Sequence, residues 1–174
     1  MPVVLLAIAI LLSVVLRSLI APIYLIISVG LSYLAALGLA VVVFEGIGHG
    51  PGLNFILPFF MFIFLMALGS DYNILVMMRI REEAHDGPLP EAVARAVAAT
   101  GGTVTSAGMI LAGTFGVLTI SGSGQIQQIG FSIAAGILMD TFLVRTLLIP
   151  STVVLMGRWN WWPSRLHTTA EGTA

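Results

Sequence analysis

The sequence has 174 residues, of which 58% are hydrophobic and 9% are charged. A soluble domain carries about 25% charged residues, so this composition excludes a water-soluble enzyme or nucleic-acid-binding protein. The formal net charge of −1 offers no electrostatic surface to nucleic acid, and the lack of cysteine excludes disulfides and cysteine-based metal sites. We therefore expect an integral, all-α membrane protein without a cofactor or a metal site.

The first apolar run, residues 3–16, precedes Arg17, which is the reverse of the charge order in a secretory signal peptide. At ~1.5 Å per residue the run measures about 21 Å, short of the ~30 Å hydrocarbon core of a bilayer. Either this helix is strongly embedded in protein, or it is the end of a span whose first turns lie upstream. We favour the second interpretation, in which the chain is a fragment of a longer protein.

Four longer apolar segments follow, which predicts a bundle of about five transmembrane helices over residues 1–157, with a tail at 158–174. The expected spans are residues 1–20, 22–44, 55–79, 101–120 and 125–148. The charged connection is 79–100, where Pro88 and Glu91 are typical of a helix start. The apolar stripe within residues 92–97 predicts a short helix lying at the membrane interface.

The arginines predict the orientation. Six of the seven lie in the first and third connections and after the last span: Arg17, Arg79, Arg81, Arg95, Arg158 and Arg165. Because basic residues favour cytoplasmic loops, we expect a multi-pass protein of the cell (inner) membrane, with its N-terminus outside and its C-terminus cytoplasmic. Three tryptophans after the last span are expected at the level of the lipid headgroups: Trp159, Trp161 and Trp162.

Asp71 is the most informative polar residue, because apolar residues dominate the segment around it, 55–78. It is expected ~24 Å from the outer end of its span, where an unpaired carboxylate is costly. We expect this carboxyl to face the bundle interior and either pair or stay protonated, which suits a carrier of protons. The neighbouring Tyr72 can donate a hydrogen bond to a carboxylate. The alternative is a purely structural hydrogen bond between helices.

Asp140 is a second intramembrane acid, and it shares one helix face with Ser132 and Gly136. Arg145 lies five residues further on, ~140° around an α-helix, so we expect a poor geometry for a pair within the helix. Arg145 is expected to reach the cytoplasmic boundary or an acid of another helix. Structural and functional roles stay open for Asp140 and Arg145. A second ridge of small residues, which predicts helix packing, runs through Gly108, Ala112 and Gly116.

Several sequence blocks together carry a family resemblance. In order they are Gly69–Arg79, Ala99–Gly101 with Thr105–Gly108, Gly136–Arg145 with Pro150, and Trp161–Pro163. They resemble the C-terminal half of MMPL transporters, which belong to the RND superfamily and are typical of actinobacteria. The resemblance covers nearly the whole chain. It implies that the five spans match helices eight to twelve of a twelve-helix transporter.

The resemblance also implies a mechanism. In that family, proton flow drives the export of lipids or other hydrophobic compounds, and Asp-Tyr pairs on two central helices form the proton relay. Asp71 and Tyr72 match the pair of the second half, and Asp140 with Arg145 are possible accessory charges. The first half and the extracytoplasmic domains have no counterpart in this chain, so the expected partner is a missing N-terminal half or a second copy.

Two functions therefore stay open. The first is the C-terminal membrane part of a proton-coupled exporter, whose partners are the lipid bilayer, protons and a hydrophobic or lipid substrate. The alternative is a non-transporting helical membrane protein, or a remnant that acts only when assembled with a partner chain. An enzyme is not expected, because none of the three histidines lies in a predicted span, and His49 falls in an outer connection.

Overall fold

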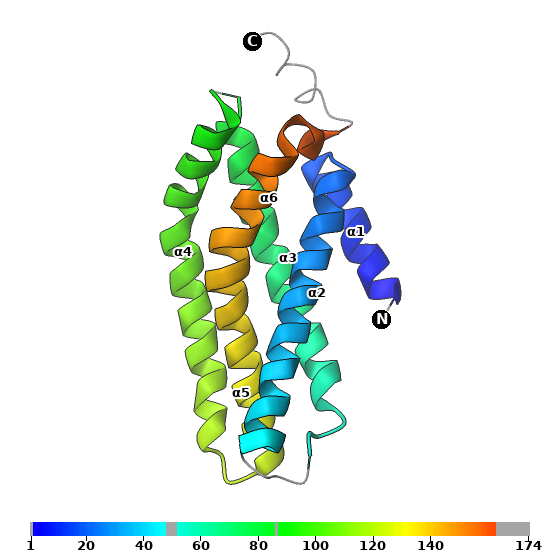
Figure 1. Ribbon diagram of the computed structural model, residues 1–174, viewed down its shortest axis with the longest axis vertical. Coiled ribbons are helices and arrows are strands. Elements are labelled where there is room, and N and C mark those ends of the chain that lie inside the picture. The colour runs from blue at the N-terminus through cyan, green and yellow to red at the C-terminus, as the bar shows by residue number, and fades with distance from the viewer. Residues whose placement is uncertain (1, 48–51, 86, 163–174) are drawn as a thin grey trace.

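The computed structural model describes residues 2–47, 52–85 and 87–162, and these residues form a bundle of long helices (Figure 1). The main helices are α1 (Pro2–Leu16), α2 (Ile20–Val41), α3 (Leu57–Glu83), α4 (Leu89–Val117) and α5 (Gly124–Met139). The described residues contain no strand. The prediction of an all-α, polytopic membrane protein is confirmed. His49, His167 and the tail from residue 163 lie outside the described residues.

Shorter helical elements extend the main ones. The π-helix η1 (Val42–Ile47) follows α2, and the 3₁₀-helix η2 (Leu118–Ile120) follows α4. After α5, the chain continues through the π-helix η3 (Asp140–Leu148), α6 (Ile149–Met156) and the 3₁₀-helix η4 (Gly157–Trp161). The helix that begins with α5 therefore runs past the expected end at residue 148, across Pro150.

Four of these helical stretches are long and apolar enough to cross a membrane: Ile20–Ile47, Leu57–Glu83, Leu89–Ile120 and Gly124–Met156. The apolar helix Val3–Leu16 is shorter, as the sequence indicates. Pro58 and Pro90 lie in the first turns of α3 and α4, where a residue without an N–H costs nothing.

The fourth helix differs from the prediction. A short interfacial helix over residues 92–97 and a separate span over 101–120 were expected, but both belong to the continuous helix α4. Gly101 and Gly102 each cost a helix about 1 kcal/mol, which is too little to interrupt a helix of 29 residues that packs along its length. The apolar stripe that includes Ala92, Val93 and Ala96 is buried within the bundle.

The connections gather at two ends of the bundle (Figure 1). The α1–α2 turn, the α3–α4 connection and the end of α6 lie at one end, and the α2–α3 and α4–α5 connections lie at the other. Arg17 adopts a left-handed backbone conformation, φ 49°, in the tight turn between α1 and α2. The connections that carry arginine thus share one end of the bundle.

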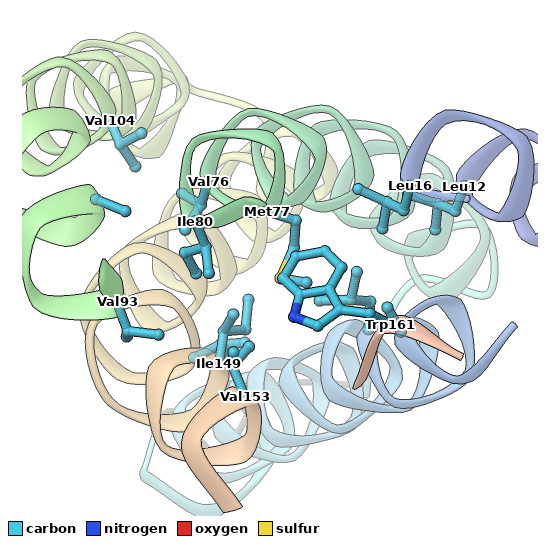
Figure 2. Close-up of a cluster of buried hydrophobic side chains, with 14 residues drawn as sticks. Leu12, Leu16, Val76, Met77, Ile80, Val93, Val104, Ile149, Val153 and Trp161 are labelled. Carbon is cyan, nitrogen blue, oxygen red and sulfur yellow. The ribbon is translucent and has the colours of Figure 1, made fainter. Parts of the chain in front are cut away.

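The segment after α6 folds back onto the N-terminal helices. The backbone N–H of Leu19 donates to the carbonyl of Trp162 at 3.0 Å, and the Ser18 hydroxyl donates to the carbonyl of Asn160 at 2.7 Å. Trp161 is 3% exposed and belongs to the same core as Leu12 (Figure 2). η4 turns the indole of Trp161 inward, so this side chain packs in the protein core instead of facing lipid headgroups directly.

Glycines allow α5 to pack closely in the centre of the bundle. A Cβ added to Gly136 would lie 2.7 Å from the side chain of Leu65 on α3 and 3.2 Å from Ala36 on α2. The expectation that Gly136 permits close helix contact is confirmed. On the second predicted ridge, Gly108 and Ala112 are buried, whereas Gly116 has open space around it.

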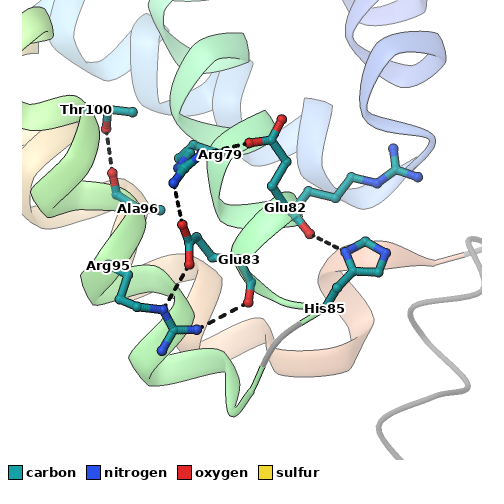
Figure 3. Close-up of polar contacts among 8 residues, drawn as sticks. Arg79, Glu82, Glu83, His85, Arg95, Ala96 and Thr100 are labelled. Carbon is teal, nitrogen blue, oxygen red and sulfur yellow. Dashed lines mark hydrogen bonds and ion pairs between the residues drawn. The ribbon is translucent and has the colours of Figure 1, made fainter.

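Ion pairs join α3 to α4 at the end of the bundle that carries the arginines (Figure 3). The Glu83 carboxylate accepts from Arg79 on its own helix at 2.6 Å and from Arg95 on α4 at 2.9 Å. These side chains are partly exposed, so each pair contributes little to stability. The apolar helices therefore give way to a charged surface at this end.

Candidate functional site: an intramembrane charge cluster

Asp71 lies on the outer surface of the described bundle. Ser70 and Asn73, on either side of it in the sequence, are buried. Since successive helix residues point ~100° apart, Asp71 falls on a different stripe, shared with the exposed Leu75 and Met78. The expectation that Asp71 faces the interior is wrong for the bundle formed by this chain. Its carboxyl is exposed on a face that is otherwise apolar.

Tyr72, the residue after Asp71, contacts a buried side chain of the bundle. Its aromatic ring lies beneath the guanidinium of Arg145, with the Cζ atom 4.5 Å from the ring centroid. This distance is well within the ~6 Å range of a cation–π interaction. Because Tyr72 is on α3 and Arg145 is on η3, the contact links two helices. It also places a buried charge next to the Asp-Tyr pair that the sequence singled out.

Arg145 and Asp140 form an ion pair within one helix. The Arg145 Nη2 atom donates to the Asp140 Oδ2 atom at 2.5 Å, and the two side chains are 4% and 9% exposed. The prediction of a poor intrahelical geometry is wrong, because it assumed an α-helix. Residues 140–148 form the π-helix η3, in which each turn spans one more residue, and residues five apart lie nearly above one another.

The hydrogen bonds of η3 show this wider spacing. The backbone N–H of Ile149 donates to the carbonyl of Val144, five residues earlier. The Thr146 hydroxyl likewise donates to the carbonyl of Thr141, at 3.1 Å. Pro150 follows directly, and in an α-helix its ring would clash with the carbonyl four residues before it. The wider turn of the π-helix before Pro150 relieves this clash.

Close packing fixes η3 against α4. A Cβ added to Gly108 on α4 would overlap the Oγ1 atom of Thr141, so glycine is required where the two helices touch. Thr141 is next to Asp140, and this contact therefore positions the ion pair as well.

The ion pair leaves polar atoms without partners. Several buried atoms of the described side chains lack a hydrogen-bond partner. They are Oδ1 of Asp140, Nε and Nη1 of Arg145, and both side-chain amide atoms of Asn73. Each buried polar atom without a partner costs free energy, so such groups are rare unless they serve a function. The cluster of Tyr72, Asp140 and Arg145 thus combines a buried charge pair with unused hydrogen-bonding capacity.

The sequence singled out the four residues but not their arrangement. It predicted Asp71 and Tyr72 as one unit and left Asp140 and Arg145 as accessory charges. The structure brings Tyr72, Asp140 and Arg145 together, and it leaves Asp71 at the edge of the group. The available signal was an acid and a base five residues apart, followed closely by a proline. The described residues contain no group of three or more potential metal ligands among His, Asp and Glu.

Comparison with known proteins gives a consistent result. Residues 1–172 match the MMPL family. The chain is 47% identical over 155 residues to the probable transport protein MmpL12 of Mycobacterium tuberculosis, covering 89% of this chain and 13% of that protein. It is 46% identical over 151 residues to the sulfolipid-1 exporter MmpL8 of the same organism, covering 87% and 14%. It is also 41% identical over 165 residues to the putative membrane protein ActII-3 of Streptomyces coelicolor, covering 95% and 23%. The chain thus spans less than a quarter of the length of these relatives.

Proposed function

The chain belongs to the MMPL family, and from this premise we propose that it supplies the C-terminal membrane part of a proton-coupled exporter of lipids or other hydrophobic compounds. Two of the relatives, MmpL12 and MmpL8, are named as a probable transport protein and an exporter, which agrees with a role other than catalysis. The relative MmpL8 is named as an exporter of sulfolipid-1, and an amphiphilic lipid of that kind is the substrate class we propose here.

The observation that carries this proposal is the contact between Tyr72 and Arg145. Asp71 and Tyr72 are adjacent on α3, and the guanidinium of Arg145 lies over the Tyr72 ring. A carboxyl within the membrane favours its neutral form unless a charge or a hydrogen bond stabilises the anion. The Tyr72 ring thus links the helix turn that carries Asp71 to a buried charge pair on another helix, and we propose that Asp71 carries the proton at this place.

In this proposal each residue of the cluster has a distinct role. Asp71 carries the proton, and Tyr72 holds the position between Asp71 and Arg145. Asp140 neutralises Arg145 within the bundle, which keeps the guanidinium in place at a depth where a lone cation is costly.

The exposed position of Asp71 supports a second half-bundle as partner. A carboxyl in contact with lipid is unfavourable, so we propose that another set of helices covers this face of α3. That set can be an N-terminal half or a second copy of this chain. The alternative function, a helical protein that acts only in a complex, predicts the same covering without proton movement. Proton-coupled transport distinguishes the two.

The orientation is also part of the proposal. Arg17 lies in the α1–α2 turn, Arg79 and Arg81 near the end of α3, and Arg95 near the start of α4, which supports a cytoplasmic position for that end of the bundle. Residues 1–157 then form the membrane domain of a protein in the cell membrane, with the tail 158–174 inside the cell.

A chimera tests the proposed function. This chain replaces the matching 151 residues of MmpL8, and sulfolipid-1 export is measured in cells that lack their own MmpL8. We expect export by the chimera and none by its Asp71→Asn variant, which keeps nearly the same shape but cannot ionise. Both proteins should reach the membrane in equal amounts. Undiminished export by the Asp71→Asn chimera would contradict the proposal.

A further inference from the structure

A cavity with a partly polar lining borders the ion pair between α3, α4 and η3. Thr100 and Gly101 on α4 and Thr141, Arg145 and Thr146 on η3 contribute to its lining. It offers about 20 Å³ to the centre of a water molecule. On that measure about 10–15 Å³ suffices for one water, provided that two to four polar partners are present. Size and lining therefore meet the requirements of a single ordered water.

The hydrogen-bonding groups around this cavity complement one another. Arg145 is buried, and its Nε and Nη1 atoms are donors without a partner among the described residues. The Thr100 hydroxyl donates to the carbonyl of Ala96 at 2.8 Å, and the Thr146 hydroxyl donates to the carbonyl of Thr141. Both hydroxyl oxygens therefore remain available as acceptors. A molecule that accepts from Arg145 and donates to the threonines fits, and water does both.

The charge balance favours a neutral ligand. Asp140 already neutralises Arg145 at 2.5 Å, and Arg145 is the only charged side chain that lines this cavity in the described part of the chain. An anion would therefore meet no net positive charge, and a cation would meet the donors of the guanidinium. The remaining lining residues are Val76, Val97, Val104 and Thr105, of which only Thr105 is polar, and the small volume limits the ligand to about the size of a water molecule.

We propose that this cavity is a hydration site, in which an ordered water bridges Arg145 to the hydroxyls of Thr100 and Thr146. Thr146 is exposed and Thr100 is partly exposed, so the bridge connects the buried ion pair with the surface of the bundle. The site goes beyond the transport proposal, since it can be present whether or not the chain carries protons. It also gives the unused donors of Arg145 their partner.

The depth of the cavity makes the site distinctive. Thr100 lies 11 positions after the start of α4 at Leu89, which is about 16 Å along the helix axis. The charged groups that mark the end of the bundle, such as Arg95 with Glu83, lie more than a helix turn closer to that end. A water beside Arg145 would thus lie within the apolar part of the bundle, where lipid-facing groups meet no water.

Two neighbouring glycines provide the variant and its control. Gly101 lines the cavity, and Gly102 does not belong to the lining. A Cβ added to either glycine would meet no atom within 4 Å, so both alanine variants should fold and should gain similar helix propensity. The methyl group of Gly101→Ala would project into the cavity and reduce the space left for a water. Thr100→Val adds a third variant that keeps the shape but removes an acceptor.

Water-edited solid-state NMR of the ¹⁵N-arginine-labelled chain in deuterated lipid bilayers measures the outcome directly. The Arg145 signals are identified by their loss in Arg145→Gln, and the partly exposed Arg95 is the hydrated reference. We expect Arg145 Nε to receive water magnetisation nearly as fast as Arg95. Transfer should slow by about threefold or more in Gly101→Ala and Thr100→Val, and stay unchanged in Gly102→Ala.

Three results would overturn the proposal. The first is transfer to the Arg145 side chain in the unaltered chain as slow as that to the backbone amide of Arg145 itself. The second is fast transfer that persists in Gly101→Ala. The third is an equal slowing in Gly101→Ala and Gly102→Ala, which would reflect a general change in the helix. None of these results bears on export by the chimera, so the hydration site and the transport function are tested separately.

Discussion

The guanidinium of Arg145 lies over the ring of Tyr72, 4.5 Å from its centroid, and this contact joins η3 to α3. On one side of it Arg145 pairs with Asp140, and on the other Tyr72 adjoins Asp71 in the sequence. Four intramembrane polar residues thus form one arrangement, with Asp71 at its exposed end. Each part of this arrangement can be tested separately.

The ion pair predicts an asymmetric response to substitution. Arg145→Met leaves the Asp140 carboxylate buried without its partner, which should destabilise the fold by about 3–5 kcal/mol. The double variant Asp140→Leu/Arg145→Met removes both charges and should regain most of that loss. Thermal unfolding in detergent, followed by circular dichroism, measures both. Arg95→Met, at a partly exposed pair, is the control and should lower the midpoint much less. A double variant as unstable as Arg145→Met would contradict the assignment.

The cation–π contact predicts that the ring of Tyr72 matters more for stability than its hydroxyl does. Tyr72→Phe keeps the ring beneath Arg145 and should be close to neutral, whereas Tyr72→Leu should lose about 0.5–2 kcal/mol. A double-mutant cycle with Arg145→Met isolates the interaction, because the loss should vanish when the guanidinium is absent. Equal stability losses for Tyr72→Leu with and without Arg145 would show that the two residues are independent.

The glycine at the α4–η3 contact predicts a steric effect. Gly108→Ala places a methyl group against Thr141 and should destabilise the bundle by about 1–3 kcal/mol, despite the better helix propensity of alanine. Combining it with Thr141→Ala should restore part of the loss. Gly113→Ala on the same helix is the control, because its added methyl group meets nothing within 4 Å. A stabilising effect of Gly108→Ala in thermal unfolding would contradict the observed packing.

The orientation predicts which positions react with a membrane-impermeant thiol reagent. The chain has no cysteine, so single substitutions give no background. Cysteines at Gly50 and Ser123 should label from outside intact cells, and cysteines at Asp86 and Thr169 should label only after permeabilisation. Gly50, Asp86 and Thr169 lie outside the described residues, and Ser123 precedes α5. Labelling of the Thr169 position in intact cells would overturn the cytoplasmic C-terminus.

The helices were predictable because apolar composition and length dominate within a membrane. Residues 22–44 and 55–79, for example, contain most of α2 and α3. The sequence could not show where helices depart from the α-helical period. A prediction based on 100° per residue separates Asp140 from Arg145, and only the π-helix reverses that result. The burial of Trp161 likewise depends on a turn after α6 that no periodicity reveals.

The candidate site was predictable in its residues and not in its geometry. Asp71 stood out because a carboxyl in an apolar segment is costly. Whether it faces inward depends on which neighbours fill the core, and Ser70 and Asn73 do so here. Small and polar residues do not show from the sequence which helices touch. The same residue types can pack against a helix, form a hydrogen bond or face a partner chain. The contact of Tyr72 with Arg145 therefore required the tertiary structure.

The central claim is that Asp71 carries protons, and the most direct measurement is proton movement by the MmpL8 chimera in proteoliposomes that contain a pH-sensitive dye. An imposed pH gradient should decay faster with the chimera than with empty liposomes, and Asp71→Asn should return the decay to the rate of empty liposomes. The matched control is Leu75→Ala, one turn away on the same exposed stripe, which should preserve the fast decay. A gradient that decays as fast with Asp71→Asn as with the unaltered chimera would contradict the account.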